Sequence, residues 1–363
     1  MRPARLASSS FAAPVRRQRG AALLAALLFA AAGIAHYLAV AALVRFLLAT
    51  LAIAALAWLL AISCEAVGAH LGSAPTAFLH ASLGNLPELF VVIFALKDHE
   101  LALAQSALVG SLLANALFVL GLVLITGARQ AQDGVMRFSA QLASDTATLL
   151  LVCAFIIVLL ALALSTHGPA ARHVEAISLV GAGSLLVVYA MWLAGAMNRE
   201  RSAPVRPAAA ASVALPESLA LLVLGALGAA FASDWLISSA APAIRSLSLS
   251  RAFVGIVIVA IAGNAVENAS GVLLAARGQA ELAVALVKGA VAQIAAFLLP
   301  AAVVVSAALP VHFTFALPPL YAGAILLTAL ALRQVSGDGE ASLFEGVALV
   351  ALYAIIAVIA ALG

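Results

Sequence analysis

Charged side chains are scarce in this chain: Asp, Glu, Lys and Arg together make up only 9% of its 363 residues. A soluble globular domain typically carries about 25% charged residues. Hydrophobic residues reach 66%, and the mean hydropathy is +1.19. This composition excludes an ordinary soluble domain and indicates a protein whose solvent is the lipid bilayer.

Cysteine is nearly absent as well, with Cys64 and Cys153 the only two. Two isolated cysteines in apolar runs provide neither a disulfide framework nor a metal cage. The seven histidines are scattered without the spacing of zinc ligands. We therefore expect no cofactor. The small net charge of +3 comes largely from arginines in the tail and loops, so it does not indicate a nucleic-acid partner.

Long apolar runs indicate an all-α polytopic membrane protein. A helix needs roughly 20 apolar residues to cross the hydrocarbon core, and a backbone in lipid must satisfy its own hydrogen bonds within helices or a closed barrel. The runs lack the alternation of strands, so helices are favoured. Eleven spans are expected, at approximately residues 21–40, 43–64, 75–96, 101–126, 140–164, 173–197, 214–235, 252–275, 281–308, 313–332 and 343–362.

Lys and Arg are divided unequally between the alternate loops of this arrangement. Twelve fall on the side of the amino terminus and five on the other side. Because cytoplasmic loops carry the excess of Lys and Arg, we expect a cytoplasmic amino terminus in the cell (inner) membrane. Arg16, Arg17 and Arg19 before the first run also fit a cleavable signal peptide, but the absence of a following polar domain favours a retained helix.

One polar stretch, residues 198–213, divides the apolar pattern and is expected to be a cytoplasmic linker. A basic tail (1–20), a first helix (21–40) and five spans in residues 43–197 precede it, and five spans in residues 214–363 follow it. Two five-helix units joined by one such loop cross the membrane in opposite directions. This is the inverted-repeat plan of many secondary transporters.

The two halves carry matching motifs. Gly84–Glu88 reads Gly-Asn-Leu-Pro-Glu, and Gly263–Glu267 reads Gly-Asn-Ala-Val-Glu. A small-residue element begins 26 residues after the Gly of each motif, at Gly110–Asn115 and at Gly289–Gln293. A single motif of this kind would be weak, but the equal spacing in both halves indicates a duplicated site.

The motif glutamates suggest cation binding. A charged side chain near the centre of a membrane helix costs about 2.5–3.5 kcal/mol, so Glu88 and Glu267 need a partner or a function. Asn85 and Asn264, three residues earlier, place an amide on the same helical face. Carboxylate and amide oxygens are ligands for hard cations such as calcium. Because protons compete for the same carboxylates, a shared midplane site with alternating access would make an antiporter.

From about Arg45 to its end, through these motifs, the chain resembles the calcium/proton exchangers of the calcium/cation antiporter superfamily. The resemblance implies that calcium and protons are the transported partners and that the two glutamates bind calcium. The residues that it implies for the site are Glu88, Glu267, Asn85, Asn264, Asn115 and Gln293.

Five further residues are candidate modulators of this site: Lys288, Asn268, Ser111, Glu65 and Asp234. Asn268 stands where the family's second motif usually ends in His. Lys288 occupies a position that is apolar in the family, five residues before Gln293. Its ammonium either snorkels toward the cytoplasmic interface or enters the cavity beside Glu267, where it would weaken calcium binding.

Other functions stay open. The same scaffold serves sodium/calcium or monovalent cation/proton exchange, although Gln293 stands where the sodium/calcium branch generally has Asp, which favours protons. An intramembrane hydrolase is a remote alternative, because Ser184 has no midspan histidine to act as its base. We therefore expect a transporter and not an enzyme.

Overall fold

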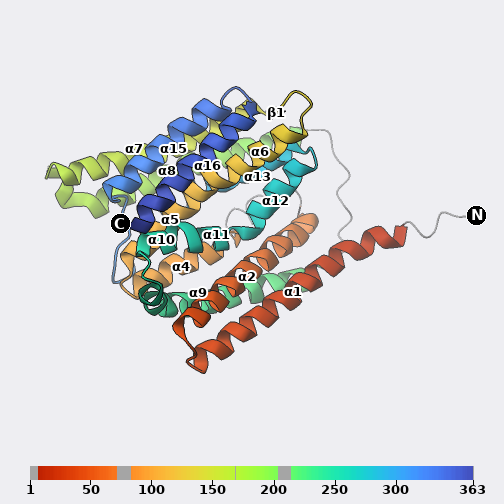
Figure 1. The fold of residues 1–363 in the computed structure, drawn as a ribbon, viewed down its shortest axis with the longest axis horizontal. Helices are drawn as coiled ribbons and strands as arrows, with labels where there is room; N and C mark the ends of the chain where they lie inside the picture. Colours follow the sequence, from red (N-terminus) through yellow and green to blue (C-terminus); the bar gives the residue numbers. More distant parts are fainter. Residues whose placement is uncertain (1–6, 72–82, 168, 203–213, 363) are drawn as a thin grey trace, which may run out of the picture. The chain divides into compact units, whose positions relative to one another are not determined.

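The computed structural model describes residues 7–71, 83–167, 169–202 and 214–362, and most of them are helical (Figure 1). Nine helices in these ranges are long and apolar enough to cross a membrane, or ten when the bent pair Arg251–Gly263 and Glu267–Ala276 counts as one span. The expected helical membrane fold is confirmed. The span expected at 75–96 lies partly outside the described residues, so the count of eleven stays a prediction.

The chain divides into two compact units, and each unit takes segments from both halves of the sequence. The first unit comprises residues 1–94 and 191–246, and the second comprises residues 95–190 and 247–363. The units of packing therefore differ from the two sequence repeats expected at 43–197 and 214–363.

In the first unit, three long helices pack through small residues. They are α1 (Ala7–Tyr37), α2 (Ala42–Leu71) and α9 (Leu215–Leu247), and most of α4 (Leu86–Lys97) belongs to the same unit. Gly33 lies against the Trp235 ring, which also stacks on Phe29 with centroids 4.8 Å apart. Gly228 faces Leu56. These contacts hold α1 and α9 together and bring α9 onto α2.

The second unit contains most of the remaining helices. The first-half elements are α5 (Leu101–Leu113), η1 (Ala114–Val119), α6 (Leu120–Gln130), α7 (Ala140–Ser165), η2 (Pro169–His173) and the start of α8 (Val174–Ser202). The second-half elements are α10 (Arg251–Phe253), η3 (Val254–Val259), α11 (Ala260–Gly263), α12 (Ala265–Ala276), α13 (Ala280–Gln293), η4 (Ile294–Leu298), α14 (Leu299–Ser306), α15 (Pro319–Ser336) and α16 (Leu343–Leu362). Helix α7 packs on α15, α6 on α16, and α12 on α13.

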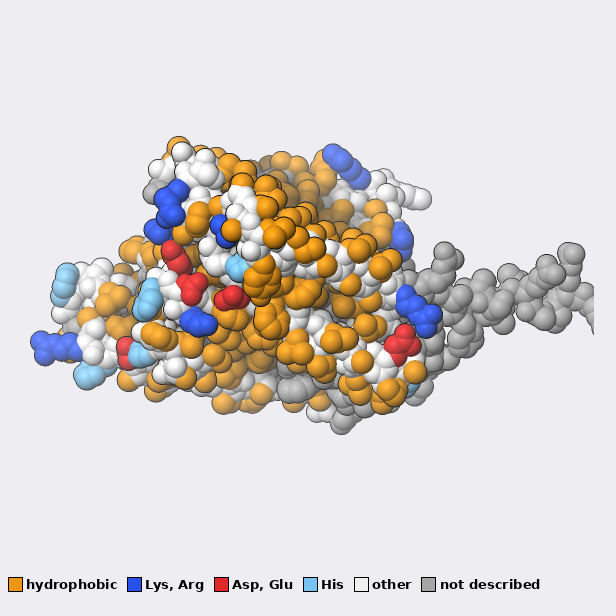
Figure 2. Space-filling model, turned by 90° about the horizontal axis from the view of Figure 1, so that it is seen from below, with side chains coloured by type: hydrophobic (Ala, Val, Ile, Leu, Met, Phe, Trp, Pro, Cys, Tyr) orange, Lys and Arg blue, Asp and Glu red, His pale blue; other side chains and the backbone are white. Residues whose placement is uncertain are grey.

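Large apolar side chains remain on the surface of both units. Examples are Leu27 on α1, Leu224 on α9 and Phe344 on α16, which are 60%, 62% and 79% exposed. Figure 2 shows one face on which hydrophobic side chains predominate and charged ones are few. Surfaces of this kind fit a lipid solvent, because exposed apolar patches of this extent are rare on soluble monomers.

The local structure repeats along the chain together with the motifs. Helices α4 and α12 both contain 12 residues, and four pairs of helices begin 179 residues apart. The paired first residues are Leu86 and Ala265, Leu101 and Ala280, Leu120 and Leu299, and Ala140 and Pro319. This constant spacing supports a duplication. The opposite direction of the two repeats stays a prediction.

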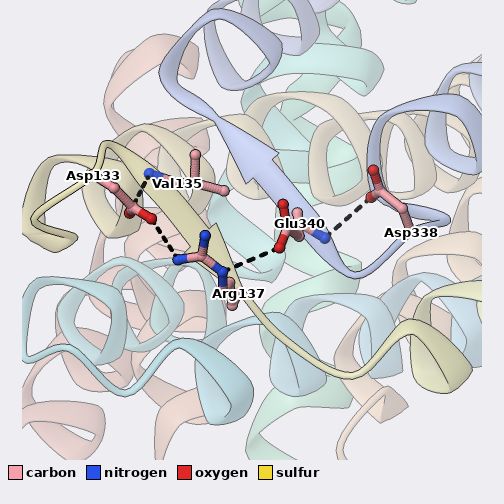
Figure 3. A network of polar contacts seen from close by, with 5 residues as sticks. All are labelled: Asp133, Val135, Arg137, Asp338 and Glu340. Carbon is pink, nitrogen blue, oxygen red and sulfur yellow. Dashed lines mark hydrogen bonds and ion pairs between the residues drawn. The ribbon is translucent and has the colours of Figure 1, made fainter.

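Strands β1 (Val135–Arg137) and β2 (Glu340–Ser342) form a small antiparallel sheet between two loops of the second unit. On its exposed side, Arg137 lies 2.7 Å from Asp133 and 3.1 Å from Glu340 (Figure 3). The hydrogen bond from Arg137 holds the pKa of Asp133 below its usual value. The stabilisation from this ion pair is therefore present at neutral pH and is lost as pH falls through that lowered pKa, and it is small because the pair is exposed.

Helices α5 and η3 of the second unit approach each other backbone to backbone. A Cβ atom on Gly110 would lie 2.4 Å from the Cα of Ile256, and one on Gly255 would lie 1.9 Å from the Oγ of Ser106. Small residues allow membrane helices to pack this closely. Ser111 follows Gly110 directly on α5, and η3 continues through α11 to Asn264.

We expect Gly110→Ala to destabilise the protein by about 1–3 kcal/mol, because backbone atoms cannot move aside for the added methyl group. Gly289 is the matched control, since it holds the corresponding place in the second repeat and a Cβ there meets nothing within 4 Å. Gly289→Ala should be neutral or stabilising, as alanine favours helix. Thermal unfolding of the purified variants in detergent tests this, and equal melting temperatures would contradict it.

Candidate functional site

Both Gly-Asn-x-x-Glu motifs lie where a helix begins. Asn85 and Asn264 immediately precede α4 and α12, and each accepts a hydrogen bond at its carbonyl from the residue four positions later, at 3.1 and 2.9 Å. Asn264 leaves the helical conformation, with φ −104° and ψ 13°, and the two parts of this span are bent by 63°. The helix is thus interrupted at the second motif.

The motif glutamates occupy the first turns of these two helices. In the first unit, Glu88 and Asn85 are buried, with 9% and 4% of their surfaces exposed. In the second unit, Asn264 is 2% exposed and Glu267 is half-buried. Each unit therefore contains one amide–carboxylate pair at the start of a helix, where backbone N–H groups are not yet used within the helix.

Three side chains form a buried polar cluster in the second unit. The Nδ2 of Asn264 donates to the Oγ of Ser111 at 3.3 Å and to the carbonyl of Ala260 at 3.2 Å. The Nδ2 of Asn115 donates to the carbonyl of Ser111 at 2.9 Å. Ser111, a predicted modulator, thus contacts two predicted ligands: Asn115 one turn later along the same helix, and Asn264 at the break before α12.

The side-chain oxygen of Asn115 is buried, and it accepts no hydrogen bond from any residue that the structure describes. Asn115 itself is 1% exposed. Buried polar atoms in native proteins almost always have a partner, which can be water or an ion. This oxygen is therefore suited to bind a cation or a water molecule.

Asn268 brings a second amide to the same region. It lies one turn after Asn264 and so on the same face of α12. Helix α12, which carries Asn268, packs on α6 and on η1, the segment that carries Asn115. Neither side-chain polar atom of Asn268 has a hydrogen-bond partner within the described ranges.

Wide helical turns accompany the follower elements, a feature that the sequence reasoning missed. Asn115 lies within the π-helical segment η1, and the π-helical segment η4 begins directly after Gln293, which is half-buried. Such turns interrupt the regular ladder of helical hydrogen bonds and are frequent at functional sites. The sequence contains no residue pattern that specifies them.

Lys288 is fully buried, with 0% of its surface exposed. Its Nζ donates to the Oγ of Ser336 and lies 5.9 Å from the centre of the Phe138 ring. The amine lies toward the loop that carries β1, the direction expected for snorkelling, but Ser336 and Phe138 cover it, so it does not reach water as snorkelling requires. The alternative expectation was that the Lys288 ammonium pairs with Glu267. The partners that the structure describes for it are Ser336 and Phe138 instead.

The other acidic candidates lie elsewhere. Glu65 is exposed on α2 and Asp234 is half-buried on α9, both in the first unit. Glu345 accepts hydrogen bonds from the backbone N and the Oγ of Ser342, at 2.7 and 2.8 Å. This reciprocal contact is a capping box, so Glu345 stabilises the start of α16.

Comparison with known proteins identifies relatives over most of the chain. The sodium/calcium exchanger protein family matches residues 41–197 and 217–362. The chain is 31% identical to a vacuolar calcium ion transporter of Schizosaccharomyces pombe over 323 residues, which are 86% of this chain and 77% of that protein. It is 29% identical to a Ca²⁺/H⁺ antiporter of Synechocystis over 344 residues, which cover 89% and 92% of the two chains.

Solved structures show the same fold. The structure of native YfkE matches with a TM-score of 0.80 at 24% identity, covering 94% of this chain and all of that one. The H⁺/Ca²⁺ exchanger CAX matches with a TM-score of 0.70 at 17% identity, covering 94% and 92%. Helix α1 lies entirely before residue 41, the first residue of the family match.

We expect Asn115→Leu to weaken cation binding about tenfold or more, because it removes the buried amide oxygen while nearly keeping the side-chain volume. A bound cation stabilises the folded state, so calcium should raise the melting temperature of the wild-type protein in detergent more than that of the variant. Asn198→Leu, which changes an exposed amide on α8, is the control. An equal response of all three proteins to calcium would exclude Asn115 from the site.

Proposed function

Because the chain belongs to the sodium/calcium exchanger protein family, we propose that it is a secondary antiporter that exchanges calcium for protons. The observation that carries this proposal is the duplicated Gly-Asn-x-x-Glu motif at two helix starts, accompanied by buried amides. The names of the relatives from S. pombe and Synechocystis support calcium as the cation and, for the second, the proton as the counter-ion.

In this proposal one ion is shared by the two motifs near the middle of the membrane. Glu88 and Glu267 supply the carboxylates. Their amide neighbours and the follower elements supply neutral oxygens, from Asn85, Asn264, Asn115 and Gln293. Calcium takes six to eight oxygen ligands, so a site of two carboxylates and several amides fits its chemistry, with backbone carbonyls or water completing the coordination.

Coupling to protons follows from the same carboxylates. A buried glutamate favours its neutral form in the absence of a cation, and a bound cation favours its ionised form. A bundle that changes its open side only when both carboxylates are protonated or cation-bound exchanges one ion for the other. Glu88 and Glu267 are then the residues at which calcium and protons compete.

The orientation belongs to the proposal as well. Two inverted five-helix repeats would place equivalent helices on opposite sides of the shared ion. The excess of Lys and Arg in one set of loops supports an amino terminus and a 198–213 linker in the cytoplasm, with the protein in the cell (inner) membrane.

Glu88→Gln and Glu267→Gln should each abolish calcium-dependent dissipation of a proton gradient in inverted membrane vesicles, because each removes a titratable cation ligand. Glu345→Gln is the control, since Gln also serves in a capping box. Sodium, potassium and manganese added in place of calcium test the selectivity. Retained activity in both site variants would defeat the proposed site, and dissipation by sodium alone would favour monovalent exchange.

The apparent KM for calcium should rise as the pH on the calcium side falls, because protons then occupy the carboxylates. At saturating calcium the initial rate of uptake should no longer depend on that pH. Calcium uptake into proteoliposomes over a series of external pH values measures this. A KM that does not change with pH would show that protons do not compete with calcium at Glu88 and Glu267.

A further inference from the structure

The side chain of Lys288 lies inside the second unit, and the partners that the structure describes for its amine are uncharged. Lys288 is 0% exposed, whereas Lys97, the chain's other lysine, is exposed at the end of α4. Lysine is almost never fully buried unless it is paired. The contacts that the structure gives its amine are a hydroxyl group and an aromatic ring, so its position calls for an explanation.

The hydroxyl partner has a defined role. Ser336, the last residue of α15, is 0% exposed and donates its own hydrogen to the carbonyl of Leu332 at 2.6 Å. Its oxygen is therefore left to accept from the Nζ of Lys288. The hydrogen bond ties α13 to the end of α15.

The aromatic partner is held by the sheet. The backbone N of Phe138 donates to the carbonyl of Gly339 at 2.9 Å, which continues the β1–β2 ladder by one residue. Met136 and Phe138 are buried and Arg137 between them is exposed, so Phe138 points inward while Arg137 joins the outer polar network (Figure 3). The Nζ of Lys288 lies 5.9 Å from the ring centre, within the range of a cation–π contact.

Two more contacts fix α13 to the same neighbours. The Oε2 of Glu281, in its first turn, accepts a hydrogen bond from the backbone N of Ser139 at 2.7 Å. The Oγ1 of Thr146 on α7 lies 3.5 Å from the carbonyl of Lys288. Helix α13 is thus attached at several points to the sheet, to α7 and to α15.

The anchored helix ends at a predicted ligand. Gln293 follows Lys288 by five residues, or about 7.5 Å along the helix axis. Helix α13 packs on α12, which carries Glu267, and on η1, which carries Asn115. A shift of α13 at Lys288 therefore moves Gln293 relative to both residues.

We propose that Lys288 is a positioning residue of the ion site, which holds α13 so that Gln293 stays opposite α12 and η1. This inference rests on the proposed function and refines it. A positioning role and a direct electrostatic role of Lys288 predict opposite changes in cation binding when the lysine is replaced. Loss of an anchor weakens cation binding, whereas loss of a positive charge near the site strengthens it.

The test compares Lys288→Met, Ser336→Ala and the double variant with the wild type. Methionine keeps much of the length and flexibility of lysine without the amine, and Ser336→Ala removes the acceptor while the amine remains. Lys97→Met is the matched control for loss of a lysine. Calcium uptake into proteoliposomes gives KM and kcat for each variant, and thermal unfolding in detergent gives its stability.

Each single variant should raise the KM for calcium about three- to tenfold, with a smaller change in kcat. The double variant should resemble the singles, because residues of one hydrogen bond do not act additively. Lys97→Met should match the wild type. A lower KM in Lys288→Met with an unchanged KM in Ser336→Ala would overturn the anchor in favour of a charge effect.

Lower melting temperatures with an unchanged KM would also overturn the proposal, since they show a purely structural contact. If Lys288→Met does not accumulate in membranes, Ser336→Ala decides alone by the same criterion. The wild-type measurement separates this inference from the proposed function. If the wild type carries another cation instead of calcium, the function is revised, and the same variants are compared by their KM for that cation.

Discussion

The absence of water in the bilayer core is the constraint on which this structure depends. Every polar group at that depth needs a partner within the protein or a bound ion. Glu88, Asn85, Asn264 and Asn115 are all buried in spite of this cost. Ser111 satisfies the donors of Asn264 and Asn115, and the oxygen left over on Asn115 is of the kind that a hard cation prefers.

Close packing of small residues makes this polar cluster feasible. Gly110 and Gly255 let α5 and η3 touch through their backbones, and Ser111 follows Gly110 directly in the chain. Contacts outside the cluster also position α13, the helix that ends at Gln293. There the contacts of Lys288 with Ser336 and Phe138 fix the helix. The loops also take part, because the β1–β2 sheet holds Phe138. The candidate site therefore depends on contacts well beyond its own ligands.

Much of the candidate site could be predicted from residue types and their spacing. Glu88 and Glu267 stand out because carboxylates are rare in apolar spans. The 26-residue spacing marked the two follower elements, and the family resemblance implied Asn115 and Gln293 within them. The π-helical turns at Asn115 and after Gln293 were missed, because no local residue pattern specifies them. The enclosure of the Lys288 amine was not predicted, because Ser336 and Phe138, which cover it, come from segments distant in sequence.

The sequence by itself determined the solvent, the helical class, most of the spans and the duplicated motifs, because hydropathy and spacing are local properties of the chain. Only the tertiary structure decided which side-chain atoms of the amides form hydrogen bonds within the protein and which remain available to a cation or water. It also decided that Lys288 is enclosed and that packing units combine segments from both halves. These features arise where helices distant in sequence meet, and no local pattern encodes such contacts.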